Sequence, residues 1–256
     1  MSGKKKYDLV CSLGGNCSVA HNLRFRGLRK FALPFDWTYF DNTDTVYKLA
    51  DSFAKHFKDQ LLKENLEELP INQDHKDKIQ YKDIITGIVW ANHFKSRDLV
   101  EYYNVKNKIN RRFNRLLNYI EKSNNILFIF AMNYAVEIDP FKYLYNKLKE
   151  LYPTKNINIK ILSFNNTEEI SIHFENLELC KYKRDQNLYD FTKTNFEWAF
   201  LDDIKMCNLQ NSKIITIQKI KKGIKISLIP NISTVFRFKL YFFGIRFDLL
   251  IGKERE

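Results

Sequence analysis

The stretch that decides the fold is residues 7–37, which read YDLVCSLGGNCSVAHNLRFRGLRKFALPFDW. Its apolar run, Leu9–Leu13, has the length of a strand and ends at two glycines, Gly14 and Gly15. After the glycines, apolar and small residues recur every three or four positions, at Val19, Ala20, Leu23 and Gly27. The stretch therefore predicts a strand, a tight glycine turn and a helix.

The predicted turn places Asn16, Cys17 and Ser18 in the first turn of that helix. A helix N-terminus presents unpaired N–H groups and the positive end of the helix dipole. A thiol in this position has a lowered pKa and becomes a nucleophile near neutral pH. We therefore expect Cys17 to be a catalytic nucleophile, and the alternative is a small buried cysteine at a crowded strand–helix junction.

The same block resembles a family of papain-like cysteine peptidases that is found in bacteria and viruses and is largely uncharacterised. The residues that carry the resemblance are Ser12–Gly14, Asn16–Cys17, Val19–Ala20, Leu23–Arg24, Gly27–Arg29 and Pro34–Trp37, with weaker matches at His93–Phe94 and Lys108–Phe113. The resemblance implies thiol-dependent hydrolase or acyl-transferase chemistry. It also implies a papain-like α+β fold as an alternative to the one that the strand and helix patterns predict.

A cysteine nucleophile requires a base and a residue that orients the base. His93 is the expected base because it follows a predicted strand at 83–90, and α/β sheets place their sites at strand ends. In the family this histidine is followed by an acidic and then an aromatic residue, whereas Phe94 follows directly here; His173 is an alternative base. Asp36, which belongs to the matched block, is the expected orienting residue, and Asn133 and Asp139 are alternatives.

Two further roles are open for the glycine turn and the helix that follows it. Asn16 and the Cys17 N–H group can stabilise an oxyanion, or Asn16 can cap the helix. His21 lies four residues after Cys17 on the same face, a spacing that suits a metal pair, but the sequence offers no further ligands and we expect no metal.

The glycine turn also suits an anion cradle made of Gly14, Gly15, Asn16 and Ser18. Five arginines can supply phosphate contacts in that case, or can form a solvated, salt-bridged surface: Arg24, Arg29, Arg111, Arg112 and Arg115. The corresponding alternative function is a transferase that uses a nucleotide- or phosphate-linked donor for bacterial surface polysaccharides. Residues 241–245, YFFGI, resemble short tails of capsule and surface-glycan enzymes.

The formal net charge of +12 predicts attraction to an anionic substrate or an anionic membrane surface. A nucleic-acid-binding module is a further alternative, although the sequence has no readable nucleic-acid-binding motif. The four cysteines form no C-x-x-C pair, no stretch is long and apolar enough to span a membrane, and we expect no cofactor. These features favour a cytoplasmic protein, with a peripheral position at the inner membrane surface as an option.

Strands that alternate with helices predict an α/β domain over residues 1–210, with a mainly parallel sheet flanked by helices. The expected later strands are 126–131, 157–164 and one or two within 168–183, and the expected helices are 45–66, 96–123, 139–153 and 195–207. The alternating pattern of residues 211–256 predicts a basic appendage of two β-hairpins.

Overall fold

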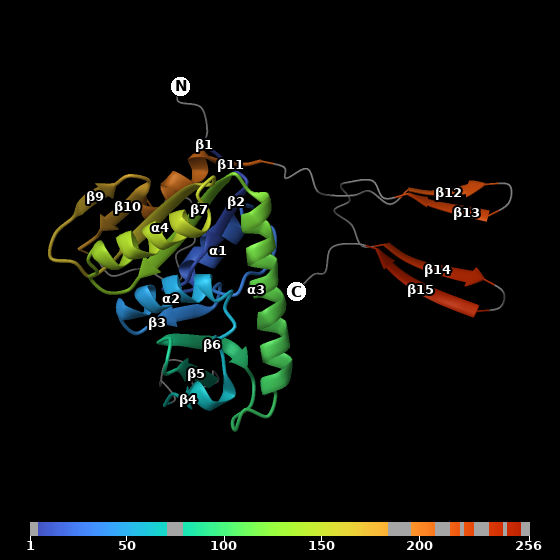
Figure 1. Cartoon of the computed structure of the whole chain (residues 1–256), viewed down its shortest axis with the longest axis horizontal. Coiled ribbons are helices and arrows are strands. Elements are labelled where there is room, and N and C mark those ends of the chain that lie inside the picture. The colour runs from blue at the N-terminus through green and yellow to red at the C-terminus, as the bar shows by residue number, and fades with distance from the viewer. Residues whose placement is uncertain are drawn as a thin grey trace. The chain divides into compact units, whose positions relative to one another are not determined.

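The computed structural model describes residues 5–70, 79–183 and 196–207, together with the strand residues 216–220, 223–227, 236–242 and 245–251. The chain divides into two compact units, Met1–Cys207 and Asn208–Glu256. Each unit is described by itself (Figure 1).

The first unit is built on a five-stranded sheet. Its strands, in spatial order, are β2 (Leu9–Ser12), β7 (Asn125–Met132), β8 (Asn156–Ser163), β10 (Leu177–Lys181) and β9 (Ile170–Phe174). The first four of these strands are mutually parallel, and β9 pairs antiparallel with β10 in a hairpin. Every residue of β7 after Asn125 is buried, as expected of a central strand that is covered on both faces.

Helices cover both faces of this sheet, and alternate residues of β2 show which helix covers which face. Val10 packs in one cluster with Leu23 of α1 (Ser18–Phe25) and with Trp198 of the 3₁₀-helix η3 (Phe196–Asp203). Leu9 and Cys11 pack in the other cluster, which contains the apolar faces of α2 (Asp44–Ala54), α3 (Tyr102–Lys122) and α4 (Asp139–Leu151).

A second, four-stranded sheet is inserted between α1 and α3. All its neighbouring strands are antiparallel, in the order β3 (Thr38–Phe40), β6 (Ile88–Phe94), β5 (Ile79–Asp83) and β4 (Leu66–Glu68), with the short 3₁₀-helix η1 (Lys63–Asn65) before β4. Helix α3 runs from this sheet to the larger one (Figure 1). A short parallel pair, β1 (Lys5–Tyr7) with β11 (Ile204–Met206), joins the two ends of the unit.

The structure is thus a mixed α/β arrangement, and the expectation of one mainly parallel sheet is correct only in part. The helix expected over 45–66 ends at Ala54, because His56, Phe57 and Leu61 adopt left-handed backbone conformations with φ of 51°, 58° and 53°. The helix expected over 195–207 is a 3₁₀-helix followed by β11. The strand expected over 83–90 is shifted to Ile88–Phe94.

The second unit contains the two expected hairpins. Strand β12 (Thr216–Ile220) pairs antiparallel with β13 (Gly223–Ser227), and β14 (Phe236–Phe242) pairs antiparallel with β15 (Ile245–Ile251). Within the described part of the chain, no helix combines the length and the apolar character that crossing a bilayer requires.

Candidate active site

The glycine turn after β2 is shaped by contacts within the protein. Gly14 and Gly15 have φ of +100° and +91°, which strongly favours glycine. A Cβ on Gly15 would lie 2.3 Å from the carbonyl oxygen of Ala131 and 2.7 Å from the sulfur of Met132, and one on Gly14 would lie 2.8 Å from Oγ1 of Thr38. The glycines are therefore needed so that the end of β2 can approach β7 and β3 closely.

Asparagine side chains link the carboxyl ends of three parallel strands. Asn16, which follows β2 and is 3% exposed, donates from Nδ2 to Oδ1 of Asn133, which follows β7, over 2.7 Å. The Asn16 Oδ1 atom accepts from the Ser18 backbone N–H at 2.8 Å and from the Ser18 hydroxyl group. Asn165, which follows β8, donates from Nδ2 to the Asn133 carbonyl oxygen at 2.9 Å. These bonds hold Asn16 and Ser18, the two residues that flank Cys17 in the chain.

Cys17 is partly exposed at the start of α1 and already has helical backbone angles, with φ −72° and ψ −14°. Its carbonyl oxygen accepts from the His21 N–H at 3.1 Å, the i to i+4 bond of an α-helix. Side chains at i and i+4 share a helix face, so His21 lies on the same face of α1 as Cys17, one turn further along. The His21 ring meets the Trp37 ring edge to face, with centroids 4.8 Å apart and planes at 82°.

In the sequence, the spacing of Cys17 and His21 suggested only a possible pair of metal ligands. The described residues contain no group of three or more His, Cys, Asp or Glu side chains that could hold a metal ion. The i, i+4 spacing of Cys17 and His21 is the sequence signal that places the thiol and the imidazole on one face of the helix.

His93 lies in a different environment. It is part of β6, not a residue that follows a strand, and it is 5% exposed beside the ring of Trp90 at a centroid distance of 5.7 Å. Among the residues that the structure describes, neither ring nitrogen has a hydrogen-bond partner, so His93 makes no hydrogen bond to Cys17. Burial, and secondarily the charges of Arg112 and Lys108, lower the pKa of His93 to about 3. Because β6 belongs to an antiparallel sheet, the strand-end argument used for His93 does not apply to it.

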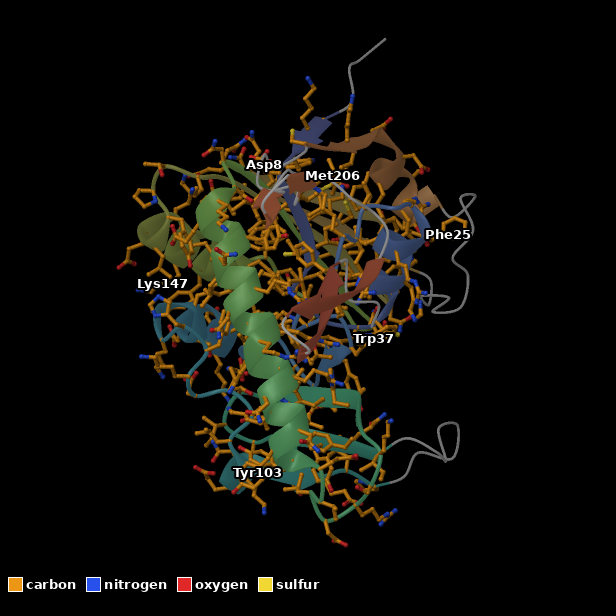
Figure 2. The ribbon with its side chains drawn as sticks, turned by 90° about the vertical axis from the view of Figure 1, so that its right-hand side faces the viewer. Asp8, Phe25, Trp37, Tyr103, Lys147 and Met206 are labelled. Carbon is orange, nitrogen blue, oxygen red and sulfur yellow. The ribbon has the colours of Figure 1, made fainter. Side chains whose placement is uncertain are left out.

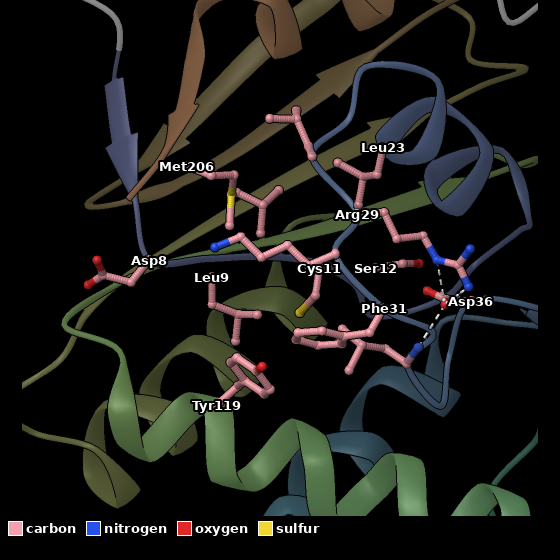
Figure 3. A pocket seen from close by; sticks show the side chains of 14 residues that line it. Asp8, Leu9, Cys11, Ser12, Leu23, Arg29, Phe31, Asp36, Tyr119 and Met206 are labelled. Atoms are coloured by element: carbon pink, nitrogen blue, oxygen red, sulfur yellow. Dashed lines mark hydrogen bonds and ion pairs between the residues drawn. The ribbon is translucent and has the colours of Figure 1, made fainter. Parts of the chain in front are cut away.

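Asp36 forms a buried ion pair. It is 2% exposed and accepts from Nε and Nη2 of Arg29 at 2.9 and 2.6 Å and from the Leu33 N–H at 2.8 Å (Figure 3). Burial raises the pKa of Asp36, although the Arg29 guanidinium opposes the shift. The pair adjoins a cavity of about 10 Å³, which Cys11 also lines; burial raises the pKa of the Cys11 thiol well above its usual value. These contacts of Asp36 fix the loop between α1 and β3.

The five candidate phosphate-binding arginines are not gathered at the glycine turn as a group. Arg29 binds Asp36, and Arg115 of α3 donates from Nη1 to the carbonyl oxygen of Ala32 at 2.9 Å. Arg112 is buried beside His93, whereas Arg111 is exposed on α3 and Arg24 is exposed on α1. Arg29 and Arg115 thus support the loop that carries Trp37 to His21.

Comparison with known proteins identifies a family and a curated relative. A family model described as "Putative papain-like cysteine peptidase" matches residues 8–169. An uncharacterized protein, R408, of Acanthamoeba polyphaga mimivirus is 26% identical over 174 residues, which cover 62% of this chain and 74% of that protein. No solved structure matches the chain significantly. The family match includes the glycine turn, Cys17 and His21.

Proposed function

The chain belongs to the family of putative papain-like cysteine peptidases, and from this premise we propose that it is a thiol-dependent hydrolase or acyl transferase with Cys17 as nucleophile. The observation that carries the proposal is the position of Cys17, partly exposed at the start of α1 with His21 one turn further along the same face. The helix dipole stabilises a thiolate at this position, and an imidazole beside it can take the thiol proton.

In the proposed reaction, His21 takes the proton of the Cys17 thiol, and Sγ attacks the carbonyl carbon of the substrate. The carbonyl π electrons move to oxygen, and the N-terminal turn of α1 stabilises the resulting oxyanion. When the tetrahedral intermediate collapses, the bond to the leaving group breaks, and the leaving group takes the proton from His21. Water, or a second acceptor group, then cleaves the thioester by the same steps and restores the thiol.

The base in this proposal is His21 rather than His93. A pKa of about 3 keeps the His93 imidazole neutral at pH 7 but makes it a weak base, and its buried nitrogens have no hydrogen-bond partner in the described part of the chain. Asn133, expected to orient the base, binds Asn16, and Asp36 binds Arg29. We therefore propose that Asn16 and Asn133 are positioning residues, which hold the turn that carries the thiol.

The two alternative functions gain no support from the described contacts. A phosphate-donor transferase would use the glycine turn as an open cradle, but the space at Gly15 is filled by the Ala131 carbonyl and Met132. A nucleic-acid-binding module would use arginines that are free to contact phosphates. Arg29 instead binds Asp36, and Arg115 binds the Ala32 carbonyl oxygen.

The experiment that tests the proposal is alkylation of the full-length protein by iodoacetamide at pH 6, with each cysteine followed by peptide mass spectrometry. Cys207, which is also partly exposed, is the internal reference, and Cys11 and Cys180 are buried. We expect Cys17 to react at least tenfold faster than Cys207, since a lowered thiol pKa enriches the thiolate at pH 6. His21→Gln should remove most of this advantage, and His93→Gln should leave it in place.

Three results would contradict the proposal. One is a Cys17 rate in the wild type that equals the Cys207 rate across pH 5.5–9. The second is an advantage of Cys17 that His21→Gln leaves unchanged. The third is an advantage that survives His21→Gln but is lost in His93→Gln, which would return the role of base to His93. Circular dichroism of each variant establishes that it is folded before its rate is compared.

A further inference from the structure

The exposed face of α1 carries three chemically active side chains in a line. Cys17, His21 and Arg24 stand at i, i+4 and i+7; Cys17 and His21 are partly exposed, and Arg24 is exposed. The opposite face is buried and consists of Ser18, Val19, Ala20, Asn22 and Leu23. Since helical positions i, i+4 and i+7 share one face, the stripe is continuous.

Arg24 differs from the neighbouring arginines in its contacts. Arg26 is bound to Asp202 at 3.1 Å with a side chain that is 3% exposed, and Arg29 is bound to Asp36. The Arg24 side chain, by contrast, is exposed and has no hydrogen-bond or ion-pair partner within the described ranges 5–70, 79–183 and 196–207. It is thus available to a ligand.

The spacing of Arg24 from Cys17 suits recognition of a group remote from the reacting bond. Seven residues of α-helix separate the two Cα atoms by about 10 Å. Long side chains in helices lean towards the helix N-terminus, and in this direction a guanidinium at position 24 comes nearer to the thiol than the Cα distance indicates. The adjacent Phe25 is 52% exposed and adds an apolar surface at the outer end of α1 (Figure 2).

We propose that Arg24 is a specificity-determining residue, which binds an anionic group of the substrate, carboxylate or phosphate, about two helical turns from the carbonyl that Cys17 attacks. The inference rests on the proposed function. A guanidinium binds either group in a bidentate manner. The sequence SVAHNLRF of α1 has no acidic residue that would compete for Arg24, and the net charge of +12 favours the approach of an anion.

The test uses maleimides as probes of the full-length protein, because they react with the thiol and can carry tails of chosen length and charge. Each probe has an alkyl tail of two to eight carbons that ends in a carboxylate, a phosphonate or a neutral amide. The measured quantity is the ratio of the Cys17 labelling rates for the anionic and the amide probe of equal length. This ratio cancels the intrinsic reactivity of Cys17, so it reports on Arg24 even if the thiol is not activated.

We expect the wild-type ratio to reach on the order of fivefold at one intermediate tail length in low salt, and to fall as salt is added. Arg24→Gln should bring the ratio close to one, and Arg24→Lys should retain part of it. Arg97→Gln, which removes an exposed arginine beside Glu68, is the matched charge control and should leave the ratio unchanged. The anionic tail with the higher ratio distinguishes a carboxylate substrate from a phosphate substrate.

Two results would overturn the inference. The first is a ratio that Arg24→Gln leaves unchanged or that Arg97→Gln lowers equally, because the anion is then attracted by the overall charge. The second is a ratio that is independent of tail length. Failure of the proposed function has a different signature, since the amide probes would then label Cys17 no faster than Cys207 and without dependence on His21.

Discussion

The side chain of Asn16 donates a 2.7 Å hydrogen bond to Oδ1 of Asn133, and this bond joins the end of the glycine turn after β2 to the residue that follows β7. Asn16 also accepts from the Ser18 N–H, so one buried amide connects the sheet edge to the first turn of α1. The position of the Cys17 thiol therefore depends on a contact between residues that are 117 positions apart.

We predict that Asn16→Ala lowers the free energy of unfolding by about 2 kcal/mol, because it removes a cap of α1 and a buried side-chain hydrogen bond. Asn133→Ala should cost about 1 kcal/mol, since Asn133 is exposed and its truncation removes one bond. Urea denaturation of both single variants and of the double variant gives the coupling energy. Strictly additive losses would contradict a direct bond between the two side chains.

Gly15→Ala should be strongly destabilising, by about 3 kcal/mol or more, because a Cβ would collide with the Ala131 carbonyl oxygen at 2.3 Å and the φ angle is +91°. Gly27→Ala is the matched control. Its φ is +68°, but a Cβ there meets nothing within 4 Å, so only the backbone strain of about 1 kcal/mol remains. Equal midpoints of urea unfolding for the two variants would show that the close approach of the glycine turn to β7 is wrong.

The ion pair of Arg29 and Asp36 supports the loop that carries Trp37. Asp36→Ala should cost about 3–5 kcal/mol, because it leaves the Arg29 guanidinium, with a side chain that is 15% exposed, without its buried partner. The double variant Arg29→Met, Asp36→Leu should be more stable than Asp36→Ala, since it leaves no unpaired charge. Thermal unfolding compares the three proteins, and a double variant less stable than Asp36→Ala would contradict this account.

His93 should make stability depend on acid pH. Its pKa is depressed to about 3 in the folded protein, against about 6.5 in the unfolded chain, so the unfolded chain binds more protons between these values. The stabilisation is complete above pH 6.5 and is lost as the pH falls towards 3. Between pH 7 and pH 4.5 the free energy of unfolding should fall by about 3 kcal/mol from this group.

His93→Leu should remove that component of the pH dependence, whatever its effect at pH 7. His56→Gln, which replaces an exposed histidine, is the control and should keep it. Urea denaturation at pH 7 and pH 4.5 measures the difference for each protein. A wild-type difference that persists undiminished in His93→Leu would show that His93 is not buried as a neutral imidazole.

The order of strands and helices around the large sheet was predictable, because buried parallel strands such as β7 are continuous apolar runs in the sequence. The second sheet was not predicted as a sheet. Its central strand β6 pairs with β3 and β5, and these short strands are assembled by tertiary contacts rather than by a local pattern. The end of α2 was missed because left-handed residues such as Phe57 carry no glycine or proline signal.

Of the candidate site, the sequence indicated the glycine turn and Cys17, since strand, glycine pair and helix are local features. The partners were predicted less well, because pairing depends on topology. His93 was placed after a strand that in fact continues to Phe94, and the partner of Asn16 lies 117 residues away. The i, i+4 relation of Cys17 to His21 was readable from the sequence but was weighed only as a metal pair.

The central claim is that Cys17 and His21 form an activated thiol–imidazole pair. Thiolate absorbance at 240 nm, measured from pH 4 to 10 as the difference between the wild type and Cys17→Ser, reports the ionisation of Cys17 directly. We predict a midpoint at least one pH unit below the value of about 8.5 for an ordinary thiol, and a return towards that value in His21→Gln but not in His93→Gln. A wild-type midpoint at or above about 8.5 would contradict the account.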